Sequence, residues 1–230
     1  MKGFFIALEG IDGCGKSTQI KALAEWLPAS GLMPDGAQLV VAKEPGGTAF
    51  GASLRNMLLT PEVGKEPCPR AELLLYMADR AQHVDTVIMP ALNNGHWVLC
   101  DRYSMSTVAY QGYGRGWPRY DIQMLNHYAS IGLWPDLILW IDISVDEALK
   151  RTRNKQPDRI EAEGKEFLRR VRQGYEEHNA KMIFLGAHTS SVVSSQRKTL
   201  CMRINGSKDV ESVTQICKNV ISDRVEALES

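Results

Sequence analysis

The sequence lacks an excess of charge of either sign. Its 230 residues carry 27 basic and 27 acidic side chains, which cancel. A chain without a net positive field has no general attraction to nucleic acid or to an anionic membrane. A DNA-directed ATPase is also disfavoured, because no basic stripe runs along the sequence. Any site for an anion must therefore be local.

Cysteine is scarce as well. The five cysteines are odd in number, widely spaced and never arranged as C-x-x-C, which argues against a disulfide framework and against a zinc site. This pattern is typical of a reducing compartment. The five residues are Cys14, Cys68, Cys100, Cys201 and Cys217.

Long apolar runs are missing. The first run, residues 4–8, is too short for the core of a signal peptide, and no other stretch approaches the length that crosses a membrane. We therefore expect a soluble, cytoplasmic protein. The chain also has no internal repeat and no linker-like segment, so residues 1–230 are interpreted as a single domain.

Short apolar segments follow one another along the chain with long helical patterns between them. Within the apolar segments, polar and apolar residues do not strictly alternate. Strand-like segments lie at residues 4–8, 39–42, 97–100, 137–143 and 199–204. Helical periodicity covers residues 71–92, 120–131, 145–153, 166–185 and 210–228. This order predicts an α/β fold with a five-stranded parallel sheet, strands buried on both faces and helices on either side. The serine-rich residues 186–198 are expected to form a flexible surface loop.

One stretch carries a complete phosphate-binding motif. Residues 10–17 read GIDGCGKS and match G-x-x-x-x-G-K-[ST] at every fixed position. The motif follows the apolar run 4–8 and precedes a helical pattern in residues 19–27. This strand-to-helix context disfavours the alternative of a glycine-rich turn with a chance lysine. It predicts the fold of a P-loop NTPase.

The residue types explain the chemistry of this loop. Its glycines let backbone N–H groups turn inward and join the positive end of the following helix dipole, which forms a concavity for an oligophosphate. Lys16 adds a point charge for the terminal phosphates. The predicted ATP-binding residues are Gly10, Ile11, Asp12, Gly13, Cys14, Gly15, Lys16, Ser17 and Thr18.

Two oxygen donors predict a magnesium site beside the loop. Ser17 has the hydroxyl that ligates Mg²⁺ in such loops, and Asp101 ends an apolar strand as a Walker B carboxylate does. Asp101 could instead be a helix cap. Arg102 follows it and would either hold a second phosphate or only neutralise Asp101.

Further polar residues lie where a parallel sheet binds its ligands, beyond the carboxyl ends of the strands. The turn at residues 44–48, with the sequence EPGGT, begins with the carboxylate of Glu44. Tyr76, Arg80 and Gln111 supply an aromatic ring, a cation and an amide suited to a base and its phosphate. Each of these three could equally be a core or surface residue.

Basic residues are concentrated after residue 150. Such density is usual on a solvated helix face, but residues 154–158 contain a proline that breaks the helical pattern. The first basic residues, Arg151, Arg153 and Lys155, therefore flank a loop. A mobile cationic loop is what phosphoryl transfer requires of a lid, which we expect at about residues 151–165.

Taken together, these elements resemble the thymidylate kinase (dTMP kinase) family. The resemblance rests on the loop, on EPGGT, on DRY, on AYQGxGRG and on PDL, and the order matches from the first strand to about residue 185. These segments are residues 10–18, 44–48, 101–103, 109–116 and 135–137. The resemblance implies transfer of the γ-phosphoryl group of ATP to dTMP with Mg²⁺, giving dTDP and ADP, in a homodimer.

The same resemblance implies roles for individual residues. Asp12 would lie near the sugar or phosphate of dTMP, Glu44 on the acceptor side, and Arg102 on the acceptor phosphate. Tyr76 matches the aromatic position that stacks on thymine, while Tyr110 matches the tyrosine that crowds the sugar 2′ position and favours deoxyribose. Contacts to the base are implied for Arg80, Thr107 and Gln111.

The chain departs from one branch of this family, which carries an arginine in the phosphate loop at the position of Gly13. Here the loop has no arginine and the basic residues lie in the lid, which looks like the bacterial arrangement. Lys155 stands where another arginine is expected, so the cation that reaches the phosphates stays open among Arg151, Arg153 and Lys155. Arg153 is our prediction, because a guanidinium can bridge two phosphate oxygens.

Other proteins share parts of the pattern. Another nucleoside monophosphate kinase, or a deoxynucleoside kinase, would have the same loop, Asp-Arg pair and lid. A P-loop GTPase switch would need N-K-x-D after a strand, whereas residues 154–158 are one residue too long and follow a helical pattern. The GTPase is therefore the weaker alternative.

Overall fold

The computed structural model describes residues 3–60, 66–185 and 198–229. Its centre is a five-stranded parallel sheet in the order β2-β3-β1-β4-β5. The strands are β1 (Phe4–Glu9), β2 (Leu39–Lys43), β3 (Trp97–Asp101), β4 (Leu137–Asp142) and β5 (Leu200–Asn205). The predicted α/β class, strand number and strand direction are confirmed.

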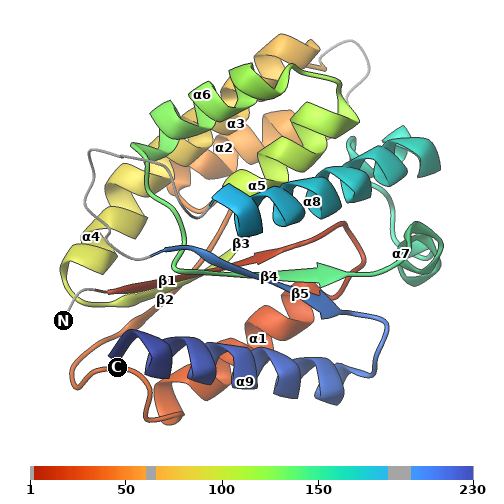
Figure 1. Cartoon of the computed structure of the whole chain (residues 1–230). Coiled ribbons are helices and arrows are strands. Elements are labelled where there is room, and N and C mark those ends of the chain that lie inside the picture. The colour runs from red at the N-terminus through yellow and green to blue at the C-terminus, as the bar shows by residue number, and fades with distance from the viewer. Residues whose placement is uncertain (1–2, 61–65, 186–197, 230) are drawn as a thin grey trace.

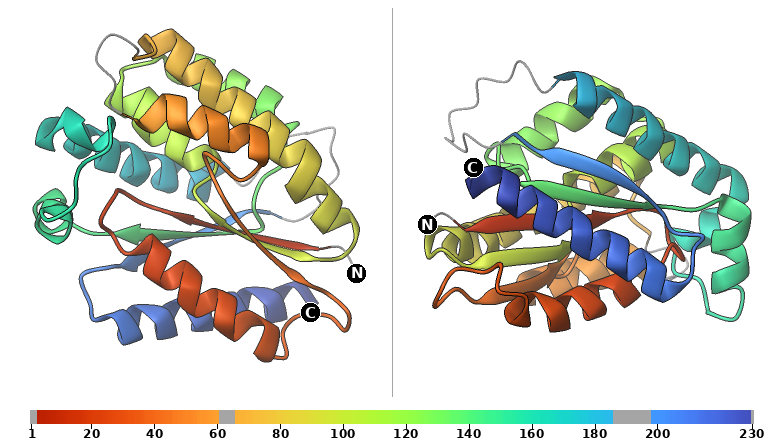
Figure 2. Two further views of the ribbon diagram at one scale, coloured as in Figure 1. Left: turned by 180° about the vertical axis from the view of Figure 1, so that it is seen from behind. Right: turned by 60° about the horizontal axis from the view of Figure 1, so that its bottom comes forward.

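Helices cover both faces of the sheet (Figure 1). On one face, α1 (Lys16–Trp26) and α9 (Val210–Glu229) pack against each other. The short helix α7 (Val145–Thr152) lies beyond the carboxyl end of β4. The larger group on the opposite face is also visible from behind and from below in Figure 2. It consists of α2 (Ala49–Leu59), α3 (Pro69–His83), α4 (Met89–Asn93), α5 (Ser104–Thr107), α6 (Arg119–Ser130) and α8 (Lys165–Leu185).

The three inner strands form the centre of the core. β1 and β4 are buried along their whole length, and β3 is buried up to its last residue. The prediction that every strand is buried on both faces is wrong for the two edges. In β2, Val41 is half exposed, and in β5, Met202 and Arg203 are exposed. These strands have a neighbour on one side only, so their outer flanks receive less cover.

Two helical regions differ from the sequence pattern. The pattern over residues 71–92 is divided into α3, a π-helical segment η2 (Val84–Ile88) and α4. A second π-helical segment, η3 (Val108–Gly114), continues α5. Helix α2 was not predicted, although Thr48 is an N-cap signal: its hydroxyl accepts a hydrogen bond from the Gly51 N–H at 2.9 Å.

The basic segment, residues 151–165, is interrupted as its proline predicts. α7 ends at Thr152, and the next helical turn is η4 (Glu161–Glu163). Asp158 Oδ1 starts that turn by accepting from the N–H groups of Ile160 and Glu161, each at 2.9 Å. Of the predicted loop at residues 186–198, all but Lys198 lies outside the described residues. Within the described part of the chain, no helix is long and apolar enough to cross a membrane.

Candidate active site

The phosphate loop lies at the carboxyl end of β1, the central strand. The chain leaves β1 for β2 on one side of the sheet and later reaches β4 on the other, so the loop occupies the point where the strand order changes direction. Gly10, Gly13 and Gly15 have φ angles of 140°, 80° and 105°, which residues with a Cβ rarely adopt. The loop therefore depends on its glycines, as the motif predicts.

Gly13 is held against α7. A Cβ built on Gly13 would lie 2.7 Å from the carbonyl oxygen of Ala148 and 3.0 Å from Thr152 Cγ2. No side chain fits there unless α7 moves. The loop of this chain therefore has no room for a cation at position 13, and a further cation for the phosphates must come from another element.

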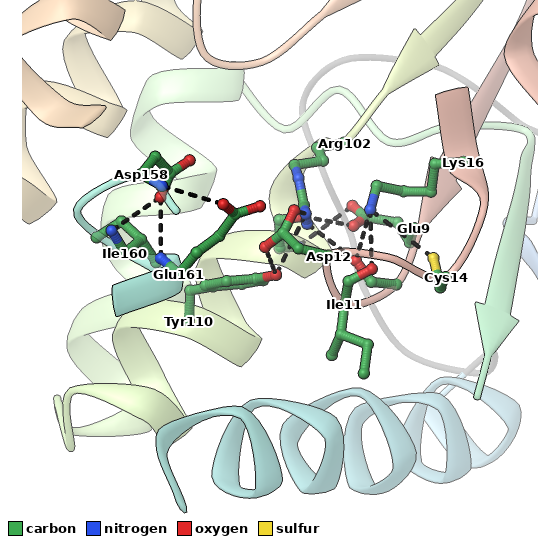
Figure 3. A network of polar contacts seen from close by, with 12 residues as sticks. Glu9, Ile11, Asp12, Cys14, Lys16, Arg102, Tyr110, Asp158, Ile160 and Glu161 are labelled. Atoms are coloured by element: carbon green, nitrogen blue, oxygen red, sulfur yellow. Dashed lines mark hydrogen bonds and ion pairs between the residues drawn. The ribbon is translucent and has the colours of Figure 1, made fainter. Parts of the chain in front are cut away.

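Lys16 is the first residue of α1 and is buried. Its ammonium group donates to the carbonyl oxygens of Gly10 at 3.0 Å and Ile11 at 3.1 Å, which turns the side chain back over the loop (Figure 3). All six residues 13–18 line a large cavity, the phosphate-loop cavity. This cavity joins backbone N–H groups, a helix N-terminus and a lysine, which is the chemistry that an oligophosphate needs.

The same cavity has oxygen donors suited to Mg²⁺. Ser17 and Asp101 both line it, and Asp101 Oδ1 is buried with no hydrogen-bond partner in the described part of the chain. A buried carboxylate oxygen left unpaired is unfavourable by about 1–3 kcal/mol or more, and a hard cation would satisfy it. The cap alternative has no support, because α5 begins without a side-chain cap. The residues present fit Mg²⁺.

A second cavity, the Tyr110 cavity, adjoins the first. Its lining includes every residue that the sequence assigned to the acceptor side. These are Asp12, Glu44, Tyr76, Arg80, Arg102, Thr107, Tyr110 and Gln111. The two cavities share the residues Asp12, Glu44, Arg55, Arg102 and Asp158. The fold therefore places two compartments end to end, with charged side chains at their junction.

Asp12 and Arg102 form an ion pair at this junction (Figure 3). The Tyr110 hydroxyl donates to Asp12 Oδ2 at 2.6 Å, and Arg102 also donates to the Gly10 carbonyl oxygen at 3.0 Å. Burial alone would raise the pKa of Asp12, but the charges of Arg102 and Lys16 and the Tyr110 hydrogen bond outweigh it and lower the pKa to about 2. Arg102 therefore has an ion-pair partner other than Asp101.

Arg80 is buried in the wall of the Tyr110 cavity. Its Nε donates to Glu44 Oε2 at 2.8 Å, and its Nη1 donates to Thr107 Oγ1 at 2.8 Å and to Asn126 Oδ1. His83 Nδ1 lies 3.0 Å from the other Glu44 oxygen. Two side chains of α3 thus hold Glu44 in place, and an arginine with so many partners has little freedom to move.

Glu9, the last residue of β1, was missed by the sequence analysis. It is fully buried and accepts hydrogen bonds from the Tyr103 N–H at 2.9 Å, the Ser106 hydroxyl at 2.5 Å and the Tyr175 hydroxyl at 3.1 Å. Burial raises the pKa of Glu9, and these bonds offset that only in part. Glu9 ties the phosphate loop to the chain after β3. A carboxylate directly before the first loop glycine was the available signal.

The basic segment contributes unequally to the phosphate-loop cavity. Arg151 and Lys155 line the cavity, whereas Arg153 does not. Arg151 pairs with Glu147 and donates to the Gly206 carbonyl oxygen at 3.0 Å. Arg153 is exposed and has no ion-pair or hydrogen-bond partner in the described residues. The choice of Arg153 stays a prediction.

Known proteins are similar to this chain in fold and in sequence. The family model for thymidylate kinase matches residues 8–197. The chain belongs to the thymidylate kinase family. A thymidylate kinase of Synechococcus sp. (strain RCC307) is 60% identical over 177 residues, which are 77% of this chain and 84% of that protein. One of Prochlorococcus marinus (strain MIT 9313) is 57% identical over 175 residues, which are 76% and 81% of the two chains. The crystal structure of thymidylate kinase from Ehrlichia chaffeensis has a TM-score of 0.70 at 30% identity, and the match covers 96% of this chain and 100% of that one.

The family membership confirms the predicted resemblance and the P-loop NTPase fold. The structure adds wall residues that no motif of the thymidylate kinase pattern had indicated. Arg55 on α2 borders both cavities and donates to the Pro45 carbonyl oxygen at 2.9 Å. The connection between β5 and α9 contributes Lys208 and Asp209 to the phosphate-loop cavity, and Val210, the first residue of α9, also lines it. These three residues follow a weak strand pattern and form no recognisable motif.

Proposed function

We propose that this protein transfers the γ-phosphoryl group of ATP to dTMP, giving dTDP and ADP. The proposal is supported by the family membership and by one observation above all. The phosphate-loop cavity and the Tyr110 cavity meet at Asp12 and Arg102. A donor phosphate in the first cavity and an acceptor phosphate in the second would therefore face each other, as in-line transfer requires.

On the donor side, residues 10–18 would bind the phosphates of ATP. The backbone N–H groups and Lys16 would hold the negative charge, and Lys16 would leave its loop carbonyl partners for the phosphates. Ser17 and Asp101 would hold Mg²⁺. The bound ion would supply neutralisation of the negative charge on the phosphates in this cavity.

On the acceptor side, Arg102 would bind the dTMP phosphate, with Asp12 beside it. Tyr76 would stack on thymine, while Arg80, Thr107 and Gln111 would contact the base edge from the cavity wall. Tyr110 would lie closest to the sugar of dTMP, and its hydroxyl is fixed by a hydrogen bond to Asp12. A fixed ring at the 2′ position leaves no space for a ribose hydroxyl, so deoxyribose would be preferred.

The basic segment is proposed to act as the lid. Lys155 and Arg151 already border the phosphate-loop cavity, but Arg151 would have to leave Glu147 to reach a phosphate. Arg153 follows Thr152, which lines the cavity, and would break no described contact on moving. We therefore retain Arg153 as the cation that meets the transferring group, with Arg151 and Lys155 in supporting roles.

The assembly and location are proposed on other grounds. The chain is interpreted as one nucleoside monophosphate kinase domain that forms a homodimer. An exposed apolar stripe supports a homodimer: it consists of Tyr120, Met124 and Tyr128 on α6 and of Ile131 directly after that helix. A cytoplasmic location is supported by cysteines that form no disulfide in the described chain. Light scattering after size-exclusion chromatography would give the mass of a dimer if this is right, and that of a monomer if it is wrong.

A coupled ADP-release assay over a panel of nucleoside monophosphates tests the activity. With ATP and Mg²⁺, dTMP should give the highest kcat/KM of the panel. A higher value for another monophosphate would favour the alternative of a different nucleoside monophosphate kinase, and phosphorylation of unphosphorylated nucleosides would favour a deoxynucleoside kinase. Competition of GTP with ATP, without acceptor turnover, would point to a GTPase switch.

A further inference from the structure

Glu72 on α3 is a buried carboxylate with no role in the proposed binding of ATP, dTMP or Mg²⁺. Its side chain is 1% exposed, yet it accepts four described hydrogen bonds. Three come from guanidinium groups: Arg115 Nε at 3.1 Å, Arg115 Nη2 at 3.0 Å and Arg159 Nη2 at 2.5 Å. The fourth comes from Gln111 Nε2 at 3.2 Å. Glu72 thus joins three separate parts of the chain at one point.

The arginine partners connect Glu72 to the basic segment. Arg159 belongs to that segment, and it also donates from Nε to the Leu58 carbonyl oxygen at 2.7 Å. Arg115 forms a second ion pair with Glu163, the end of η4. Residues 159–163 are therefore fixed to α3 through Glu72 at two places, one direct and one through Arg115. Ile160 between them lines the Tyr110 cavity.

The arginines also keep Glu72 ionised. Burial would raise the pKa of Glu72, but the hydrogen bonds and charges of Arg115 and Arg159 outweigh it and lower the pKa. An ionised carboxylate accepts hydrogen bonds and cannot donate one. The Gln111 side chain must therefore turn its NH₂ group toward Glu72. Glu72 does not bind the side-chain carbonyl oxygen of Gln111.

We propose that Glu72 is a positioning residue for base selection. It fixes the orientation of the Gln111 amide, so that the carbonyl oxygen is the acceptor in the Tyr110 cavity. Because Arg159 binds Glu72, this orientation depends on the basic segment. The proposal rests on the proposed function, in which Gln111 meets the base edge. A carbonyl acceptor there suits a pyrimidine whose N3 carries a hydrogen, such as thymine or uracil. Cytosine has an unprotonated N3, so two acceptors would face each other.

The test compares kcat/KM for three acceptors that share deoxyribose, namely dTMP, dUMP and dCMP. Glu72→Gln replaces the carboxylate by an amide that can also donate, so the Gln111 amide is free to turn. We expect the dTMP:dCMP ratio to fall about tenfold or more, because two buried acceptors would no longer have to face each other when dCMP is bound. The dTMP:dUMP ratio should stay within about twofold, because both bases carry N3–H.

Matched variants separate this role from a general loss of structure. Glu166→Gln makes the same chemical change at an exposed carboxylate of α8 that pairs with Arg169, and it should leave both ratios unchanged. Arg159→Met keeps the apolar stem and removes the guanidinium, so it should lower the dTMP:dCMP ratio in the same direction. Arg169→Met is its exposed control. Thermal unfolding shows which variants fold, and Arg159→Met decides the matter should Glu72→Gln not fold.

A double-mutant cycle tests whether Glu72 acts through Gln111. In a Gln111→Ala background, Glu72→Gln should change the dTMP:dCMP ratio no further. An unchanged dTMP:dCMP ratio in folded Glu72→Gln, an equal loss for dUMP, or full additivity in the cycle would each overturn the proposal. A parent protein that does not phosphorylate dTMP would contradict the proposed function itself. A parent active on dTMP whose ratios do not move would contradict only the role of Glu72.

Discussion

The two cavities are built in different ways. The phosphate-loop cavity takes one wall from eight consecutive residues, 12–19. It uses backbone N–H groups that any sequence with the right glycines would present. The Tyr110 cavity takes its wall from side chains of the phosphate loop, the β2–α2 turn, α2, α3, the β3–α5 connection, α5, η3 and the basic segment. The first is a local structure with general chemistry, while the second is assembled by the tertiary fold and carries the choice of acceptor.

The largest expected effect belongs to the local structure. Lys16→Ala should remove nearly all phosphoryl transfer, by roughly a thousandfold or more in kcat, because the ammonium group acts on charge that grows along the reaction. The fold should remain intact, since the loop conformation depends on glycines. Initial rates of ADP release and a thermal melt measure the two properties.

Lys21→Ala is a suitable control, because Lys21 is exposed on the same helix. It should leave kcat within about twofold of the parent, as is usual for surface changes. Unchanged turnover in Lys16→Ala would contradict the whole description of the phosphate-loop cavity.

The second prediction concerns the basic segment, which borders the phosphate-loop cavity but is not part of the phosphate loop. Arg153→Ala should lower kcat by about 10² to 10⁴ with a modest change in the KM for ATP, by analogy with arginine fingers. Arg153→Lys should restore only part of the rate, because an ammonium group offers a point charge without the planar fork.

The same assay on Arg151→Ala and Lys155→Ala locates the donor if Arg153 is not the one. A kcat for Arg153→Ala within about threefold of the parent would place Arg153 on the solvated face of the segment. Arg169→Ala, which removes an exposed guanidinium from α8, serves as the comparison.

A third prediction, with a smaller expected effect, concerns the Tyr110 cavity. The parent protein should prefer dTMP to its ribose counterpart, and Tyr110→Ala should narrow that preference by roughly tenfold, because space opens beside the sugar. Tyr110→Phe removes only the hydroxyl that binds Asp12 and should keep most of the preference. Ratios of kcat/KM for the two sugars give the answer, and equal use of both by the parent would reject this role of Tyr110.

The smallest effect concerns stability at the junction of the cavities. In the folded protein the pKa of Asp12 is lowered from 3.8 to about 2, so the ionised carboxylate stabilises the fold above pH 4. This contribution is lost as the pH falls from about 4 to about 2. Because the side chain is 29% exposed, we expect about 1–2 kcal/mol rather than the full value from the pKa shift.

Urea unfolding at several pH values measures this contribution. The free energy of unfolding of Asp12→Asn should be lower than that of the parent at pH 7, and the difference should shrink toward pH 2. A difference that is the same at both ends of this pH range would show that the Asp12 charge does not stabilise the fold.

The same contrast between local and assembled structure explains what the sequence could predict. Five strands, their direction and the phosphate loop follow from short-range patterns, and the structure has them. The exposure of Val41 on β2 could not be predicted, because it depends on the strand order, which places β2 at an edge. The π-helical segment η2 was hidden because residues 84–88 lie inside the continuous helical pattern over residues 71–92.

Side-chain networks were beyond the sequence for a physical reason. Glu72 and Arg159 are 87 residues apart and carry no motif, and their pairing exists only because residues 158–163 fold back onto α3. The family resemblance, in contrast, named eight of the residues that line the Tyr110 cavity. Five of these residues belong to a recognisable segment, namely Asp12, Glu44, Arg102, Tyr110 and Gln111. The preference for Gly13 over a loop arginine became explicable only when α7 was seen against it.

One competition experiment tests the central claim most directly. The parent protein receives ATP, Mg²⁺ and an equimolar mixture of dTMP, dUMP, dCMP, dAMP and dGMP, and mass spectrometry follows the diphosphates at early times. If the Tyr110 cavity selects the acceptor as described, dTDP should form faster than every other diphosphate, and Lys16→Ala should abolish all of them together. Faster formation of any other diphosphate by the parent would contradict the account.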